Sequence, residues 1–120
     1  MSCIFCEIAS GESPSYRIYE DDKIIALLDI SPRSPGHTLI IPKEHTFDLT
    51  TISEETACHI IKKAKELAPT IVEKLGAEGF TIMQNNGVAA EIGHYHLHII
   101  PKYNRKRKMD IKTVYEKITH

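Results

Sequence analysis

Three histidines at alternate positions are the most informative chemical feature of this 120-residue sequence, in the stretch His94-Tyr95-His96-Leu97-His98-Ile99-Ile100. Successive side chains of a β-strand point to opposite faces, so this spacing predicts three imidazoles on one face and apolar groups on the other. Such a row can hold a metal ion, or act on a phosphoryl or acyl group as nucleophile and proton donor. The alternative is an amphipathic strand whose solvent-facing residues are histidines by chance.

A second group of reactive side chains lies at the N-terminus, where Cys3 and Cys6 form a Cys-x-x-Cys pair. A redox motif of this kind is expected to open a helix after a strand, and a zinc ribbon needs a second close cysteine pair, which the sequence lacks. Two thiolates therefore need two other ligands, and His45 and His94 are the natural candidates. Two cysteines with two histidines form the closed tetrahedral set that is typical of structural zinc.

The segments that must position these residues follow from hydrophobic patterning. Short runs rich in β-branched and aromatic residues predict five strands, at 16–20, 24–28, 37–41, 80–84 and 94–100. Apolar residues recur every three or four positions from Ser53 to Leu75, which predicts a long amphipathic helix with Ser53 as its N-cap and Gly76 just past its end. A short helix is expected at 110–118. The elements indicate a single α+β domain over residues 1–120, with one long and one short helix and a variable basic tail at 102–120.

Overall charge and hydropathy exclude several classes of protein. Fifteen basic and sixteen acidic residues give a net charge of -1, which argues against a dedicated nucleic-acid-binding protein, although the run 105–108 is basic. That run is either a solvated surface segment or a contact for polyphosphate or acidic partners. No apolar stretch approaches the roughly 20 residues of a membrane helix, and the N-terminus does not read as a signal peptide. We therefore expect a cytoplasmic protein that does not associate with membranes.

Several motifs together resemble the histidine triad (HIT) family of nucleotide hydrolases and transferases. The histidine stretch matches the family pattern His-φ-His-φ-His-φ-φ, where φ is apolar. The segments 28–32 (Leu-Asp-Ile-Ser-Pro), 36–45 (Gly-His-Thr-Leu-Ile-Ile-Pro-Lys-Glu-His) and 84–87 (Gln-Asn-Asn-Gly) follow the family's order and spacing. The resemblance extends from Cys3 to Pro101 and implies a homodimer in which two five-stranded antiparallel sheets form one continuous ten-stranded sheet.

The resemblance also implies a role for each matching residue. His96 would be the catalytic nucleophile that carries the nucleotidyl group, and His98, the second catalytic residue, would hydrogen-bond the phosphate and the leaving group. Asn85 would orient the α-phosphate, and Asp29 would bind the ribose hydroxyls. The base pocket would be walled by apolar residues, each of which could equally be ordinary core: Ile4, Phe5, Ile8, Leu27 and Ile30. In zinc-bearing members of the family the positions of Cys3, Cys6, His45 and His94 bind a structural ion.

The function implied by the resemblance is hydrolysis of a nucleoside 5′-monophosphate, AMP or GMP, from an amine or phosphate leaving group, most closely that of a purine nucleoside phosphoramidase. A dinucleoside polyphosphate hydrolase of the same family is the nearest alternative. A nucleotide-binding regulatory or scaffold module and a zinc-dependent nucleic-acid adaptor are alternatives from other classes. The loop 88–93 is shorter than the family's usual segment, and its Glu91 favours leaving groups that carry an ammonium.

Overall fold

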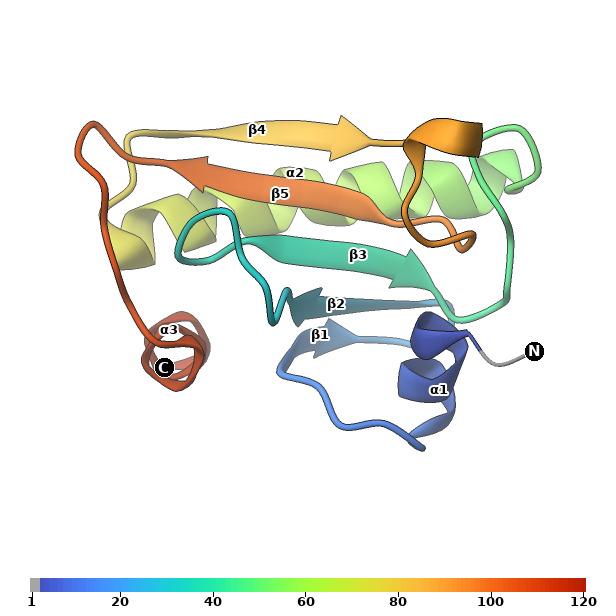
Figure 1. Cartoon of the computed structure of the whole chain (residues 1–120), viewed down its shortest axis with the longest axis horizontal. Helices are drawn as coiled ribbons and strands as arrows, with labels where there is room; N and C mark the ends of the chain where they lie inside the picture. The colour runs from blue at the N-terminus through green and yellow to red at the C-terminus, as the bar shows by residue number, and fades with distance from the viewer. Residues whose placement is uncertain (1–2) are drawn as a thin grey trace.

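The computed structural model, which describes residues 3–120, contains one five-stranded antiparallel sheet (Figure 1). The strands lie in the order β1-β2-β3-β5-β4, and each pairs only with antiparallel neighbours. Their bounds are β1 Arg17–Glu20, β2 Ile24–Leu28, β3 Thr38–Pro42, β4 Gly79–Gln84 and β5 Leu97–Lys102. The predicted α+β class and the five-stranded antiparallel sheet are confirmed.

The long helix α2 (Glu54–Leu75) covers one face of this sheet, behind the strands in Figure 1. Its first turn is capped by Ser53, whose hydroxyl accepts the N–H of Thr56, and it ends at Gly76, which has a left-handed φ of 71°. The apolar side of α2 packs against side chains of β2, β3 and β5. The core they form includes Ile60, Ala64, Ala68, Ile71 and Leu75 from the helix and Ile24, Ala26, Leu28, Ile40, Leu97 and Ile99 from the strands.

The opposite face of the sheet is partly covered by a helix that sequence patterning did not predict, α1 (Ile4–Ser10). Both predicted helices exist, the long one as α2 and the short C-terminal one as α3 (Ile111–Thr119), and α1 is a third helix that the prediction omitted. Seven residues are too few to display helical periodicity, and so short a helix is stable only through packing. Phe5 and Ile8 provide that packing, in a second core with Ile25, Leu27, Leu39 and Ile41.

The structure also corrects the strand predicted through all three histidines. Strand β5 begins at Leu97, so His98 lies in it, while His94 lies in a bend and His96 in the irregular segment before the strand. The pairing of β3 with β5 ends at Ile40 and Leu97. Before Leu97 the backbone hydrogen-bonds to the loop after β3 instead, where the N–H of Tyr95 donates to the carbonyl oxygen of Thr46 at 2.7 Å. Within residues 3–120, none of the helices has the length and apolar composition needed to cross a membrane.

A carboxylate at the turn between β1 and β2 joins that hairpin to α2. Asp21 Oδ2 is 2.7 Å from both the hydroxyl of Tyr19 and Nε2 of His59, and Oδ1 accepts the N–H groups of Lys23 and Ile24. Burial raises the pKa of Asp21, but these donors outweigh burial and hold it well below its ordinary value of 3.8. The ionised carboxylate is therefore the form that stabilises the fold.

Replacing Asp21 with asparagine should lower the free energy of unfolding by about 1–3 kcal/mol at neutral pH. The NH2 group that replaces one carboxylate oxygen cannot accept a hydrogen bond from Tyr19 or His59. Since folding depresses this pKa, the stabilisation is present above the unfolded value of 3.8 and is lost as the pH falls below it. Urea titrations should show the gap between wild type and Asp21→Asn narrowing below about pH 4. The matched control is Asp22→Asn, at an exposed neighbour; an equal loss there would contradict the prediction.

Candidate functional site

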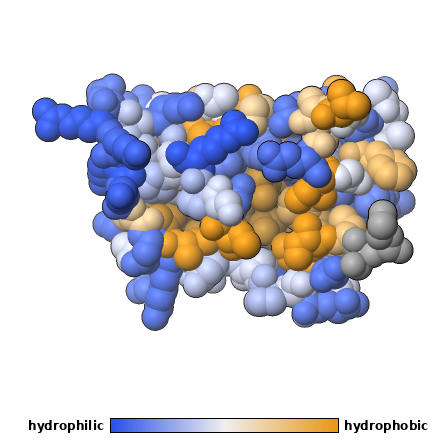
Figure 2. Space-filling model, in the orientation of Figure 1, coloured by the Kyte–Doolittle hydropathy of each residue, from blue (hydrophilic) through white to orange (hydrophobic). Residues whose placement is uncertain are grey.

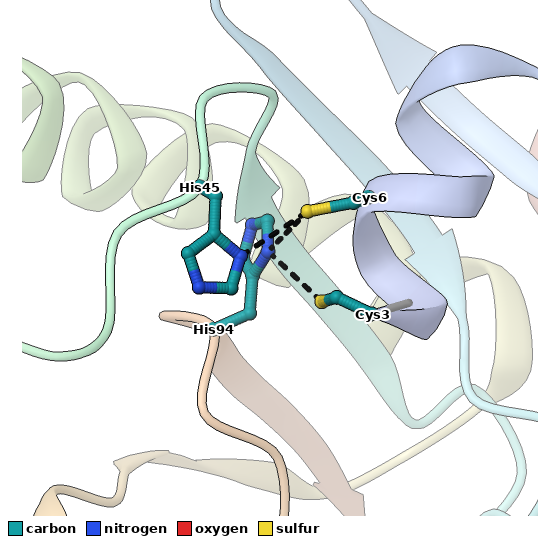
Figure 3. Close-up of side chains that lie close together, drawn as sticks. All are labelled: Cys3, Cys6, His45 and His94. Carbon is teal, nitrogen blue, oxygen red and sulfur yellow. Dashed lines mark hydrogen bonds between the residues drawn. The ribbon is translucent and has the colours of Figure 1, made fainter. Parts of the chain in front are cut away.

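Four side chains from three separated segments meet beside the N-terminus of α1 (Figure 3). Cys3 and Cys6 come from α1 and its N-cap, His45 from the loop after β3, and His94 from the segment before β5. Nδ1 of His94 lies 3.4 Å from Sγ of Cys3 and 3.6 Å from Sγ of Cys6, while Nδ1 of His45 lies 3.1 Å from Sγ of Cys6. The four candidate ligand atoms all lie within 4.8 Å of one another, and the cluster could hold a metal ion.

The backbone fixes the orientation of the buried member of this cluster. Nε2 of His94 is 2.9 Å from the carbonyl oxygen of Pro42, which can only accept, so Nε2 carries the proton. The lone pair of a neutral His94 is then on Nδ1, directed at the two sulfur atoms. A ring nitrogen held by a backbone carbonyl on its far side is the usual arrangement of a metal-ligating histidine.

A second backbone carbonyl orients His96 in the same way. The Nδ1–H of His96 donates to the carbonyl oxygen of His94 at 2.7 Å, which leaves the lone pair of the neutral ring on Nε2. The ring is buried, with its centroid 5.1 Å from that of Phe5 and 4.9 Å from that of His98. His96 therefore presents an unprotonated nitrogen, which is the form of histidine that can act as a nucleophile.

The protonation of His98 is set by a chain of hydrogen bonds that begins at the backbone. The N–H of Arg33 donates to Nδ1 of His37 at 3.1 Å, so the proton of His37 is on Nε2. That Nε2–H donates to Nδ1 of His98 at 2.9 Å, which puts the remaining proton of His98 on its own Nε2. This buried Nε2–H has no partner among the described residues. A buried donor without a partner lowers the stability of the fold unless a bound ligand supplies an acceptor for it.

Electrostatics keep this second ring uncharged at neutral pH. Burial is the main cause that lowers the pKa of His98 to about 4; the neighbouring His96, His37 and Arg33 also lower it, and Asp29 opposes them. Burial also lowers the pKa of His37. The neutral ring of His98, with its N–H on Nε2, thus lies beside His96, whose Nδ1 donates to the backbone.

The structure places the predicted nucleotide-binding residues unequally around this pair. Asn85 directly follows β4, whose last register pair is Gln84 with Leu97, so Asn85 and His96 are the next residues of the two segments beyond that pair. The carboxylate of Asp29 is 3.7 Å from Nε2 of His37. Of the five predicted base-pocket residues, three are buried in the core under α1 and two are exposed: Phe5, Ile8 and Leu27 are 4–6% exposed, Ile4 is 44% exposed and Ile30 is 80% exposed. The ring of Phe5 lies beside the rings of His94 and His96, with centroid distances of 5.6 and 5.1 Å.

Sequence reasoning missed the groups that orient the rings. The carbonyl oxygens of Pro42 and His94 are backbone atoms, which no residue pattern reveals. Arg33 was also missed, although its position between two prolines and four residues before His37 is a signal of a turn that could bring it back to the histidines. Glu91, expected near the leaving group, is exposed in the loop before His94, and its side chain forms no hydrogen bond or ion pair with residues 3–120.

Comparison with known proteins decides the family. Residues 10–105 match the model of the HIT domain. The chain belongs to the HIT family. Among solved HIT proteins, a Zn-bound histidine triad family protein from Mycobacterium smegmatis superimposes with a TM-score of 0.91 and 38% identity, over 99% of this chain and 91% of that one.

Curated HIT relatives align over most of the chain as well. An uncharacterized HIT-like protein of Methanocaldococcus jannaschii is 44% identical over 103 residues, which are 84% of this chain and 79% of that protein. The adenosine 5′-monophosphoramidase hnt1 of Schizosaccharomyces pombe is 40% identical over 108 residues, 88% of this chain and 78% of that protein. Membership of the HIT family with hydrolase relatives supports a nucleotide hydrolase.

Proposed function

We propose that this protein hydrolyses nucleoside 5′-phosphoryl compounds by way of a nucleotidyl group on His96, and that purine nucleoside phosphoramidates are among its substrates. The observation that carries the proposal is the opposite protonation of two adjacent rings: His96 offers a lone pair on Nε2, and His98 offers a hydrogen on Nε2. The similarity to a monophosphoramidase supports the same conclusion.

The proposed hydrolysis has two steps, transfer of the nucleotidyl group to His96 and its release by water. Nε2 of His96 attacks the α-phosphorus, the bond from phosphorus to the leaving atom breaks, and the leaving atom takes the bonding electron pair. An amine leaving group also takes a proton from solvent, while the Nε2–H of His98 hydrogen-bonds the departing atom and the ring of His98 stays neutral. Water next attacks the phosphorus and loses a proton to solvent, the bond from phosphorus to His96 breaks, and the nucleoside monophosphate is released.

The remaining residues of the site bind the nucleotide in this proposal. Asn85, level with His96, donates its amide to the α-phosphate, and Asp29 accepts from the ribose hydroxyls. The base packs against exposed Ile4 and Ile30, with Phe5, Ile8 and Leu27 forming the floor under them. Because Phe5, Ile8 and Leu27 are buried and have little free surface, they support the base-binding residues from beneath and make little direct contact with the base.

Zinc is the metal that we assign to the cysteine-histidine cluster. Two thiolates and two imidazole Nδ1 atoms suit tetrahedral zinc, and a full protein ligand set leaves no open position, so the role is structural. The ion would tie α1 to the segment that carries His96, and His94 would serve the metal rather than the chemistry. Thiolate ligands persist in a reducing compartment, which supports a cytoplasmic location.

A homodimer joined along β4 is the assembly that we propose. β4 is an outer strand of the sheet, and its side chains Phe80 and Ile82 are 44% and 41% exposed. Ile61 of α2, on the helix that backs this sheet, is 51% exposed. An outer strand with apolar side chains is suited to pairing with a second copy, which would extend the sheet to ten strands. Sedimentation of the wild-type protein tests this, and a monomer at micromolar concentration would contradict it.

Steady-state release of AMP from adenosine 5′-phosphoramidate tests the proposed function. We expect turnover by the pure protein, with AMP as a competitive inhibitor. Tight binding of AMP without turnover of this substrate or of a dinucleoside polyphosphate would instead support a nucleotide-binding regulatory module.

A further inference from the structure

The loop that follows β3 is hydrogen-bonded to two other segments at the end of the sheet where His96 lies. The carbonyl oxygen of Thr46 accepts the N–H of Tyr95 at 2.7 Å, in the segment before β5. Three residues further on, the N–H of Leu49 donates to Oδ1 of Asn86 at 2.8 Å, in the segment after β4. Figure 1 shows this loop, in green, beside the 3-10 helix η1 (Gly87–Ala89), in orange. We call residues 45–51 the bridging loop.

The turn that carries Leu49 is closed by its own hydrogen bonds. The carbonyl oxygen of Asp48 accepts the N–H of Thr51 at 3.1 Å, and Oδ1 of Asp48 accepts the hydroxyl of Thr50 at 2.6 Å and its N–H at 3.0 Å. The hydroxyl and N–H of Thr50, with the N–H of Gly87, hold the pKa of Asp48 below its ordinary value of 3.8 against the opposing effect of burial. The ionised carboxylate therefore fixes the turn and adds a second link to η1.

Hydrogen bonds rather than apolar burial hold the bridging loop to the segment after β4. The large apolar side chains of the two segments are exposed: Phe47 is 63% exposed, Leu49 is 56% exposed and Val88 is fully exposed. Figure 2 shows hydrophobic surface at the end of the molecule where η1 lies. Because little apolar area is buried between the segments, the bond from Leu49 to Asn86 is a main support of their relative position.

Asn86 directly follows Asn85, the residue that we propose orients the α-phosphate. The ladder between β4 and β5 ends at Gln84, so no strand pairing sets the position of Asn85 relative to His96. The backbone of Asn85 is instead held by contacts outside the ladder. Its carbonyl oxygen accepts Nε2–H of Gln84 at 2.9 Å, and the next residue is joined to Leu49.

We infer that Asn86 is a positioning residue, which acts through the bridging loop to fix Asn85 relative to His96. The loop joins the chain neighbours of these two residues, because it bonds to Tyr95 on one side and to Asn86 on the other. This inference rests on the proposed function and deepens it. A displacement of about 1 Å in a group that aligns the reacting atoms can lower a rate about 100-fold, so the bond acts mainly on kcat.

The first test removes this hydrogen bond from either side in the full-length protein. Asn86→Ala deletes the acceptor, and Leu49→Pro deletes the donor at the second position of a turn, which proline suits. Each variant should lower kcat for AMP release from adenosine 5′-phosphoramidate about 10-fold and change KM less than about 3-fold. Because both changes remove the same bond, the double variant should lose less than about 2-fold beyond either single variant.

The second test asks whether the bond acts through Asn85. Asn85→Ala should lower kcat, and addition of Asn86→Ala to that variant should lower it less than about 2-fold further. A bond that only stabilised the fold would have the same effect on kcat in both backgrounds. Asn86→Ala and Leu49→Pro should each melt within about 5 °C of wild type, since the bond is exposed to solvent.

The matched control is Asn104→Ala, the same change at an exposed asparagine beyond the far end of β5, which should have wild-type kcat and KM. Three results would overturn the inference and leave the proposed hydrolysis intact: wild-type kcat in Asn86→Ala, additive losses in Asn86→Ala/Leu49→Pro, or an undiminished effect of Asn86→Ala in the Asn85→Ala background. Wild-type kcat in Asn85→Ala would overturn it together with the proposed role of Asn85. A wild type without turnover would overturn both the inference and the proposed function.

Discussion

Replacing His96 with alanine is expected to lower kcat for AMP release from adenosine 5′-phosphoramidate by at least about 10³-fold. The change removes Nε2 of His96, the proposed nucleophile, which is left without a proton in the neutral ring because Nδ1–H donates to the carbonyl oxygen of His94 at 2.7 Å. The remaining groups, including the Nε2–H of His98, can still bind the phosphate but cannot form the covalent intermediate. The measurement is the initial rate at saturating substrate for both proteins.

Two controls separate loss of the nucleophile from loss of the fold. His120→Ala removes an exposed histidine at the end of α3 and should retain wild-type kcat. Binding of AMP by His96→Ala should remain within about tenfold of wild type, since no phosphate contact other than the attacking nitrogen is lost. A His96→Ala protein that retains a tenth or more of the wild-type kcat would show that another group, or water directly, attacks the phosphorus.

The double variant Cys3→Ser/Cys6→Ser should lose bound zinc and lower the melting temperature by more than about 10 °C, because a structural zinc contributes several kcal/mol or more to folding. Without the proposed ion, the N-terminus of α1 would no longer be joined through the metal to His45 and His94. Phe5 and Ile8, which complete the second core, are then held by a seven-residue helix alone. Metal content and thermal unfolding are measured on protein purified with zinc present.

The control for this variant is Cys58→Ser, which removes the third cysteine, exposed on α2 and outside the cluster. It should bind zinc and melt like wild type. A chelator should lower the melting temperature of wild type and of Cys58→Ser but not that of the double variant. Equal zinc content in the double variant and wild type, or a melting temperature of wild type that a chelator leaves unchanged, would contradict a structural metal at these residues.

The long helix α2 was predictable from the sequence, whereas the seven-residue helix α1 was not. The pattern from Ser53 to Leu75 gave α2 with both of its ends, because 22 residues repeat the helical period several times and a serine and a glycine cap them. The helix α1 has too few residues for such a pattern, and what stabilises it is packing of Phe5 and Ile8 against strands distant in sequence. The local pattern of apolar residues does not reveal such a contact between residues far apart in the sequence.

The site shows a similar division between residue types and the atoms that orient them. The two cysteines and two histidines of the metal cluster could be selected from donor chemistry alone, and the structure brings them together. The alternation of His94, His96 and His98 suggested one strand, but β5 begins only at Leu97. The tautomers of these rings depend on the carbonyls of Pro42 and His94 and on the N–H of Arg33, which belong to the backbone path and not to any motif.

The measurement that tests the central claim most directly is detection of the covalent intermediate. Wild-type protein is mixed with adenosine 5′-phosphoramidate, quenched within the first turnover under alkaline conditions that preserve phosphoryl-histidine bonds, digested and analysed by mass spectrometry. The account predicts an adenylyl group on His96, absent from His96→Ala, that disappears as AMP is released. Turnover with no adenylylated peptide at any time, or an adenylyl group on His98 or His94 in the wild type, would contradict it.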